Sequence, residues 1–220
     1  MKNIRRTSMA ATALLGLCLI NAAQAQLFVA NSGGQYGDNI GEYTTAGATI
    51  NGSLVTGLSN PNGVAVSGGD IFVANQFPNT IGEYTTAGAT VNASLITGLN
   101  GPGFLAVSGG DIFVANGIAG TIGEYTTAGD TINASLVSGL NGPYGLAVSG
   151  GDIFVANTYP GEISEYTTGG APVNTSLITG LDYPWGVAVE TVPEPSTYAL
   201  LAGGLGGWLL WGWRTSRTLV

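Results

Sequence analysis

The pattern of hydrophobic and polar positions along the chain is typical of short β-strands. In the segment Asp70–Asn75, Ile71 and Val73 fall on one side of an extended backbone. Phe72 and Ala74 fall on the other side. A pair of glycines precedes the segment, and two consecutive glycines suit a two-residue hairpin turn because both positions tolerate positive φ. The pattern therefore predicts a β-strand that leaves a tight hairpin.

This strand pattern repeats along the chain with a period of 41 residues. The sequence Gly-Glu-Tyr-Thr-Thr occupies Gly41–Thr45, Gly82–Thr86 and Gly123–Thr127, and a fourth copy at Ser164–Thr168 begins with Ser. Each unit is predicted to form four short strands, which in the second unit lie at 63–67, 70–75, 80–86 and 91–97. Four strands in about 40 residues are typical of a β-propeller blade.

The ends of the repeat predict how the domain closes. The domain begins at Leu27, on the second strand of a unit, and it ends with Gly186–Glu190, which matches a first strand. From Leu27 to Glu190 there are 164 residues, which is four times 41. We therefore predict an all-β domain at 26–190, a β-propeller with four blades of four strands, in which the C-terminal strand completes the first blade. A stacked β-solenoid and an eight-blade ring made by two chains are the alternatives.

One phrase of the repeat resembles a known propeller family. The segment Pro143–Asn157, together with Glu162–Tyr166, resembles the NHL repeat. NHL units commonly carry Asp at the position of Asn157 and a basic residue near the position of Glu162, and NHL propellers usually have six blades. The resemblance therefore implies a propeller blade and no particular ligand.

The N-terminus is typical of a secretory signal peptide. Met1–Arg6 is basic, Met9–Ile20 is apolar, and Ala23 and Ala25 form an A-x-A cleavage site. We therefore expect residues 1–25 to be removed and the mature chain to begin at Gln26.

The C-terminus carries a second sorting pattern. A linker at 191–197 contains the motif Val192-Pro193-Glu194-Pro195, and the following residues 198–213 carry no charge. At about 1.5 Å per residue this apolar segment is a marginal membrane span, so we predict a transmembrane helix at 198–213. The basic residues in 214–220 are typical of a cytoplasmic tail.

The order of these three elements resembles the PEP-CTERM sorting signal. The resemblance covers about the last 30 residues. It implies an exported bacterial protein of the cell envelope that an exosortase-type transpeptidase processes. It also implies an association with exopolysaccharide, with membrane anchoring before processing and an extracellular location afterwards.

Charge is distributed unevenly along the chain. All 5 basic residues lie near the two ends, whereas all 13 acidic residues lie between Asp38 and Glu194. Nucleic-acid binding needs cations that face the phosphates, so this distribution excludes it. The repeat domain also contains no His, Lys or Cys, which removes the usual catalytic bases and nucleophiles. We therefore predict no catalytic residues and a non-enzymatic protein. A metal-dependent sugar hydrolase or lactonase of the propeller type is the alternative.

The acidic residues do not form an evident metal site. They recur about once per unit at each position, whereas calcium needs several oxygens that converge on one point. The sequence therefore predicts no metal ligands and no cofactor, and calcium is the only candidate ion.

The loops that differ between units contain the candidate ligand-binding residues. These loops follow the second and fourth strands of each unit, and they are expected to lie on one face of the propeller. Exposed aromatic rings in such loops can stack on sugar rings, so we predict a polysaccharide-binding face. The alternative is that the rings pack between blades. The candidate residues are Tyr36, Phe77, Tyr144, Tyr159, Tyr183 and Trp185.

Overall fold

The computed structural model describes residues 25–33 and 37–190, and within them every regular element is a β-strand. The predicted signal peptide (all but Ala25), the sorting motif, the transmembrane helix and the basic tail lie outside the described residues. The strands are β1 (Gln26–Asn31), β2 (Asn39–Thr44), β3 (Thr49–Thr56), β4 (Pro61–Ser67), β5 (Asp70–Asn75), β6 (Thr80–Thr85), β7 (Thr90–Ile96), β8 (Pro102–Ser108), β9 (Asp111–Asn116), β10 (Thr121–Thr126), β11 (Thr131–Ser138), β12 (Pro143–Ser149), β13 (Asp152–Asn157), β14 (Glu162–Thr167) and β15 (Pro172–Ile178).

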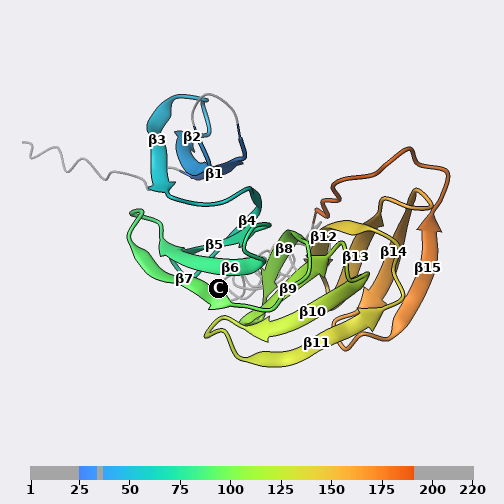
Figure 1. The fold of residues 1–220 in the computed structure, drawn as a ribbon. Helices are drawn as coiled ribbons and strands as arrows, with labels where there is room; N and C mark the ends of the chain where they lie inside the picture. The colour runs from blue at the N-terminus through green and yellow to red at the C-terminus, as the bar shows by residue number, and fades with distance from the viewer. Residues whose placement is uncertain (1–24, 34–36, 191–220) are drawn as a thin grey trace, which may run out of the picture.

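The strands form four antiparallel sheets in which neighbours in sequence are neighbours in space. Three sheets have four strands each, in the orders β4-β5-β6-β7, β8-β9-β10-β11 and β12-β13-β14-β15, and the first sheet is β1-β2-β3. Figure 1 shows these sheets side by side in an arc, as propeller blades are arranged. The prediction of an all-β, propeller-like fold is therefore confirmed.

The glycine pairs form the predicted hairpins. Gly68 and Gly69 have φ values of 65° and 95°, and they join β4 to β5 with Ser67 opposite Asp70. A side chain at either position would be strained, because both residues lie in the left-handed region. The same pair of glycines turns the chain at the start of each later blade, which explains why this loop does not vary.

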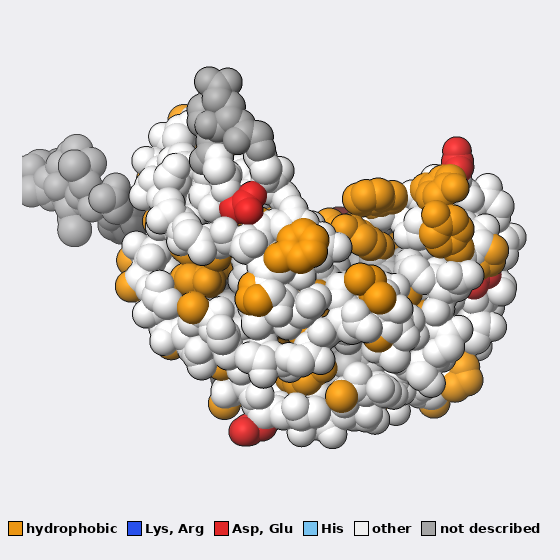
Figure 2. Space-filling model, viewed as in Figure 1, with side chains coloured by type: hydrophobic (Ala, Val, Ile, Leu, Met, Phe, Trp, Pro, Cys, Tyr) orange, Lys and Arg blue, Asp and Glu red, His pale blue; other side chains and the backbone are white. Residues whose placement is uncertain are grey.

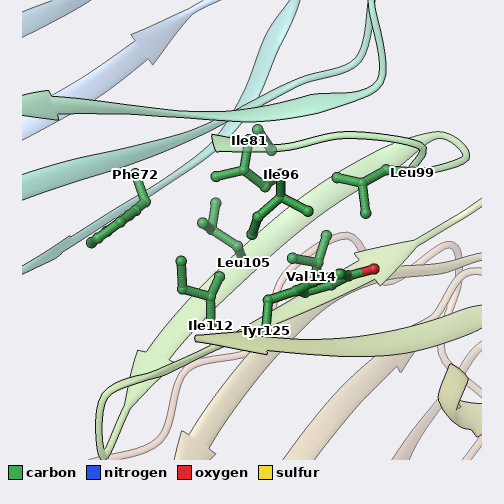
Figure 3. Close-up of a cluster of buried hydrophobic side chains, with 9 residues drawn as sticks. Phe72, Ile81, Ile96, Leu99, Leu105, Ile112, Val114 and Tyr125 are labelled. Atoms are coloured by element: carbon green, nitrogen blue, oxygen red, sulfur yellow. The ribbon is translucent and has the colours of Figure 1, made fainter. Parts of the chain in front are cut away.

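The hydrophobic core consists of separate layers between adjacent blades. In the layer of Figure 3, side chains of the second blade, including Phe72, Ile81 and Ile96, face side chains of the third, including Leu105 and Ile112. The strands β5 and β9 each contribute to two layers, because their alternate residues point to the blades on either side. In the last blade, Ile153 and Val155 of β13 contribute to the layer shared with the third blade. The alternation found in the sequence thus arises from blade stacking, and each fully buried side chain of this size stabilises the fold by about 1.5–3 kcal/mol.

The Gly of the Gly-Glu-Tyr-Thr-Thr block makes room for the Tyr two residues later. A methyl group on Gly82 would lie 2.7 Å from the hydroxyl oxygen of Tyr84. The fourth blade has Ser164 instead, and its hydroxyl donates a hydrogen bond of 2.7 Å to the Thr175 carbonyl. The Asn157 side-chain amide donates to the same hydroxyl at 2.8 Å. The fourth blade therefore has an additional polar bridge beside the buried Tyr166.

One part of the fold prediction needs correction. We expected Gly186–Glu190 to pair with the first blade, but these residues form no strand, and among the described residues the first sheet has only three strands. Trp185 and Gly186 instead lie beside Gly145 of β12, where the first strand of a following blade would lie. The three blade contacts produce an open arc in Figure 1, so the last segment does not reach β1.

Candidate functional site

The loops that vary between units lie together at one edge of the arc. In the fourth blade, the amide of Thr158 donates to the carbonyl of Gly142 at 2.9 Å, and the amide of Tyr159 donates to Asn141 at 3.2 Å. The second and third blades have equivalent bonds, including one of 2.9 Å from Gly117 to Gly101. These bonds join the loop after the second strand of a blade to the loop before its first strand. Side chains from the two loop sets therefore share one surface.

Three aromatic rings form a row along this surface. The centroids of Tyr144 and Trp185 are 4.7 Å apart with the rings tilted by 48°. Phe104 lies at 6.0 Å from Tyr144 in an edge-to-face arrangement. Such offset and edge-to-face pairs stabilise ring positions beyond the effect of burial alone. Trp185 is 60% exposed, so its ring is held by one neighbour and still accessible.

A second aromatic pair stands next to this row. Tyr159 and Tyr183 pack edge to face with centroids 5.3 Å apart, and both are about half exposed. A side-chain hydrogen bond to Tyr183 and the electrostatic effect of this neighbouring tyrosine raise the pKa of Tyr159 above the ordinary value. Burial raises the pKa of Tyr144. Both hydroxyls are therefore neutral at physiological pH and can donate and accept hydrogen bonds.

Tyr144 and Trp185 of the row and Tyr159 of the pair line a small pocket of about 210 Å³. Tyr183 packs against Tyr159 beside this lining. Figure 2 shows hydrophobic side chains gathered at the hollow of the arc. The pocket lining is mostly apolar, with the Thr158 hydroxyl and the Gln76 amide as its side-chain hydrogen-bonding groups other than the aromatic ones. We name the group Tyr144, Tyr159, Tyr183 and Trp185, together with this pocket, the aromatic pocket.

The remaining predicted site residues lie elsewhere or outside the described residues. Phe77 belongs to the same loop set and is 62% exposed, but it does not line the aromatic pocket. Tyr36 is outside the described residues. Sequence reasoning missed Ile118, which lines the pocket and is 72% exposed, because a single Ile in a variable loop carries no recognisable pattern.

The same face has a polar region at the other end of the arc. The carboxylate of Asp38 accepts hydrogen bonds of 2.7 Å from the amides of Gly33 and Asn60. These two bonds hold the pKa of Asp38 below its ordinary value. The side chain of Asn60 also bonds to Ser32 and Gln76. The loops between the first two blades are thus fixed by side-chain hydrogen bonds in place of aromatic contacts.

The acidic residues are distributed over the blades. Burial and the nearby Asp70 raise the pKa of Glu83. Burial and the nearby Asp111 raise the pKa of Glu124 in the same way. Within residues 25–33 and 37–190, no group of three or more His, Cys, Asp and Glu side chains comes together as a metal site would require. In the same part of the chain, no helix is long and apolar enough to cross a membrane.

The comparison with known families concerns the C-terminus. A model described as the PEP-CTERM protein-sorting motif matches residues 191–217, which include Val192, Pro193, Glu194 and Pro195. The chain carries a PEP-CTERM sorting motif. The motif implies that the protein is exported to the cell envelope. No curated protein matches the sequence.

Several solved structures resemble this chain in fold. A nidogen/laminin complex contains a chain of 18% identity that matches 73% of this chain and 64% of its own length, with a TM-score of 0.59. A streptogramin B lyase is 20% identical and matches 67% of this chain and 50% of its own, with a TM-score of 0.55. A functionally unknown protein from Desulfotomaculum acetoxidans is 20% identical and matches 68% of this chain and 53% of its own length, with a TM-score of 0.52. The chain thus spans about half the length of the lyase that it resembles.

Proposed function

We propose that this exported PEP-CTERM protein is a non-enzymatic component of an exopolysaccharide layer and binds neutral polysaccharide in its aromatic pocket. The observation that carries the proposal is the presence of two neighbouring aromatic pairs, Tyr144 with Trp185 and Tyr159 with Tyr183. These side chains come from two loops and the start of β12, and all but Tyr144 are at least half exposed. The apolar face of a sugar ring stacks on such side chains, and tyrosine hydroxyls can hydrogen-bond to sugar hydroxyls.

The charge of the domain favours a neutral polymer over an anionic one. Between Thr7 and Trp213 the chain has no Lys or Arg, and all of its acidic residues lie in this stretch. Uronic acids and sulfated sugars would be repelled by this field and would find no cation to pair with. A neutral glycan meets no such cost, and it needs only the stacking surface and the hydroxyl groups of the pocket.

The binding proposal is tested with the whole chain purified in detergent. Affinity electrophoresis in gels that contain a neutral glucan or an anionic alginate should show retardation by the glucan alone. Trp185→Ala and Tyr159→Ala should each weaken the retardation, with an apparent affinity for the glucan at least tenfold lower. Val91→Ala is the matched control, because Val91 is 54% exposed on the outer strand β7. Binding that survives both aromatic substitutions, or the absence of binding to any neutral polysaccharide, would refute the proposal.

We further propose that the apolar segment 198–213 anchors the chain in the membrane and that an exosortase-type enzyme then removes it. The matched motif at 191–217 supports this order of events, because it contains both the Pro-Glu-Pro sequence and the apolar segment. Mass spectrometry of the chain from its native host should find a C-terminus near Pro195. Glu194→Ala should leave an uncleaved, membrane-bound chain, and unaltered release of this variant would contradict the proposal.

A further inference from the structure

The first blade presents an apolar face that is buried in every other blade. Ile71 and Val73 of β5 are completely buried against the preceding blade. Their equivalents in β1, Leu27 and Val29, are 47% and 42% exposed. The residue types have been kept at these positions although the arc places no blade against them.

The last blade has the complementary face. Ile96 and Leu99 of the second blade are 2% and 7% exposed, because the third blade covers them. The equivalents in the last blade, Ile178 and Leu181, are 49% and 38% exposed. The two free ends of the arc are therefore the two halves of one further blade contact.

The backbone at these ends is complementary as well. Among residues 25–33 and 37–190, β1 pairs only with β2, so no described strand pairs with the amide and carbonyl groups of its other edge. The segment 184–190 has the position of a first strand but pairs with no strand among the described residues. The register of β4 on β5, in which Val64 is opposite Val73, would place Val187 opposite Val29. A strand edge of this kind is a template for another chain.

The contacts between blades explain why one chain does not close on itself. At the inner strands, a methyl group on Gly63 would lie 2.8 Å from the Gly103 carbonyl oxygen. At the outer strands, a methyl group on Gly88 would lie 2.6 Å from the Leu54 carbonyl oxygen. Because adjacent blades are in contact at both their inner and outer strands, the angle between them is fixed. A ring of four blades would need a larger angle between adjacent blades, and this angle would separate the outer strands. The arc also matches only about half of two longer chains.

We propose that two copies of this chain form one closed ring, in which residues 184–190 of each copy form the missing inner strand of the first blade of the other. The two joints are identical, so the assembly has twofold symmetry, and the inner edge of β1 is paired in both copies. Each joint covers the exposed apolar residues of both ends, Leu27, Val29, Ile178 and Leu181. The inference does not depend on polysaccharide binding.

The proposal is tested by disulfide trapping in the full chain with Cys18→Ser. One chain carries Val29→Cys and a second carries Val187→Cys, because directly opposed residues in antiparallel strands have Cα atoms close enough for a disulfide. After the two chains are mixed and oxidised, a covalent dimer should form on a non-reducing gel. The control pair replaces Val187→Cys with Ala188→Cys, whose side chain points to the opposite face of the strand and should not react.

Two results would overturn the two-copy ring. One is a chain with both Val29→Cys and Val187→Cys that oxidises only within itself, because this shows closure by a single chain. The other is the absence of the mixed dimer together with a monomeric mass of the unsubstituted chain in analytical ultracentrifugation. If the mixed dimer forms but the unsubstituted chain binds no polysaccharide, the two-copy ring stands and only the proposed function is contradicted.

Discussion

Tyr183 packs edge to face on Tyr159, with ring centroids 5.3 Å apart, although its backbone φ is 47°. The equivalent positions in the preceding units are Asn60, Gly101 and Gly142, and all three have positive φ. The two glycines adopt it without strain. A bulky side chain in the left-handed region costs about 1–2 kcal/mol. The last blade therefore carries a strained residue at the point where its ring completes the aromatic pocket, and strained residues of this kind are concentrated at functional sites.

The strain at Tyr183 predicts an unusual order of stability. Tyr183→Gly and Tyr183→Ala both remove the ring, but only the Gly variant relieves the backbone. We therefore expect the Gly variant to be more stable than the Ala variant by about 1 kcal/mol in urea unfolding. The control is Tyr159, which has no positive φ. There the Ala variant should be the more stable of the two, and the same order at both positions would contradict the strain.

The layers between blades predict a large difference between two isoleucines of one blade. Ile112 of β9 is completely buried in the layer of Figure 3, whereas Ile132 of β11 is 50% exposed. Ile112→Ala should destabilise the chain by about 2–5 kcal/mol, because it removes buried contacts and leaves a cavity. Ile132→Thr should change the unfolding free energy by less than about 0.5 kcal/mol. Equal effects in thermal melts would mean that the core does not lie between the blades.

The close contact at Gly145 predicts a selective effect on the aromatic pocket. A methyl group there would lie 2.6 Å from the Trp185 carbonyl oxygen and 2.7 Å from the Gly186 Cα atom. Gly145→Ala should therefore displace Trp185 from Tyr144, reduce polysaccharide binding and cost about 1–3 kcal/mol of stability.

Gly52→Ala is the matched control for this substitution. A methyl group on Gly52 would have only one neighbour, at 3.7 Å, and the equivalent residues of the next two blades are Ala93 and Ala134. We expect Gly52→Ala to keep both stability and binding. If Gly145→Ala also behaves in this way, the segment around Trp185 is not packed on β12.

The raised pKa values of Glu83 and Glu124 predict how stability depends on pH. Burial and a neighbouring aspartate favour the protonated carboxyl in the folded state, so the folded chain binds more protons than the unfolded chain. Their contribution should make the melting temperature fall as pH rises from the ordinary value of 4.5 through the raised folded value. The double variant Glu83→Gln, Glu124→Gln should melt higher than wild type at pH 7 and show a smaller slope across this window.

A second group acts in the opposite direction at lower pH. Hydrogen bonds to the amides of Gly33 and Asn60 lower the pKa of Asp38, so its contribution is present above the ordinary value of 3.8 and is lost as pH falls through the folded value. Asp38→Asn should weaken the acid dependence below pH 3.8 and leave the glutamate window unchanged. An unaltered melting profile in either variant would contradict the assigned cause.

The blade could be predicted from sequence because its signals are local. The alternation in Asp70–Asn75 and the glycine pair at 68–69 specify a strand and a turn within a few residues, and the structure contains both. The loop face was predictable for a similar reason, because loops that vary between otherwise equal units are recognisable without a structure.

The closing strand was not predictable, because arithmetic on strand number says nothing about the angle between blades. Four units suffice for a ring only if each contact turns the chain far enough, and that turn depends on the contacts of Gly63 with Gly103 and of Gly88 with Leu54. The pairing of Tyr159 with Tyr183 also depends on a backbone angle that the sequence does not disclose.

By itself the sequence determined the C-terminal sorting motif, the four repeating units, the strands and turns within each unit, and a domain without basic residues. These features depend on neighbours in the chain, so residue type and spacing specify them. Only the tertiary structure decided that the blades form an open arc and that Leu27 and Ile178 are uncovered. It also decided that Tyr144, Tyr159 and Trp185 line one pocket, with Tyr183 packed on Tyr159. These features depend on the packing of residues from different blades, which spacing along the chain does not specify.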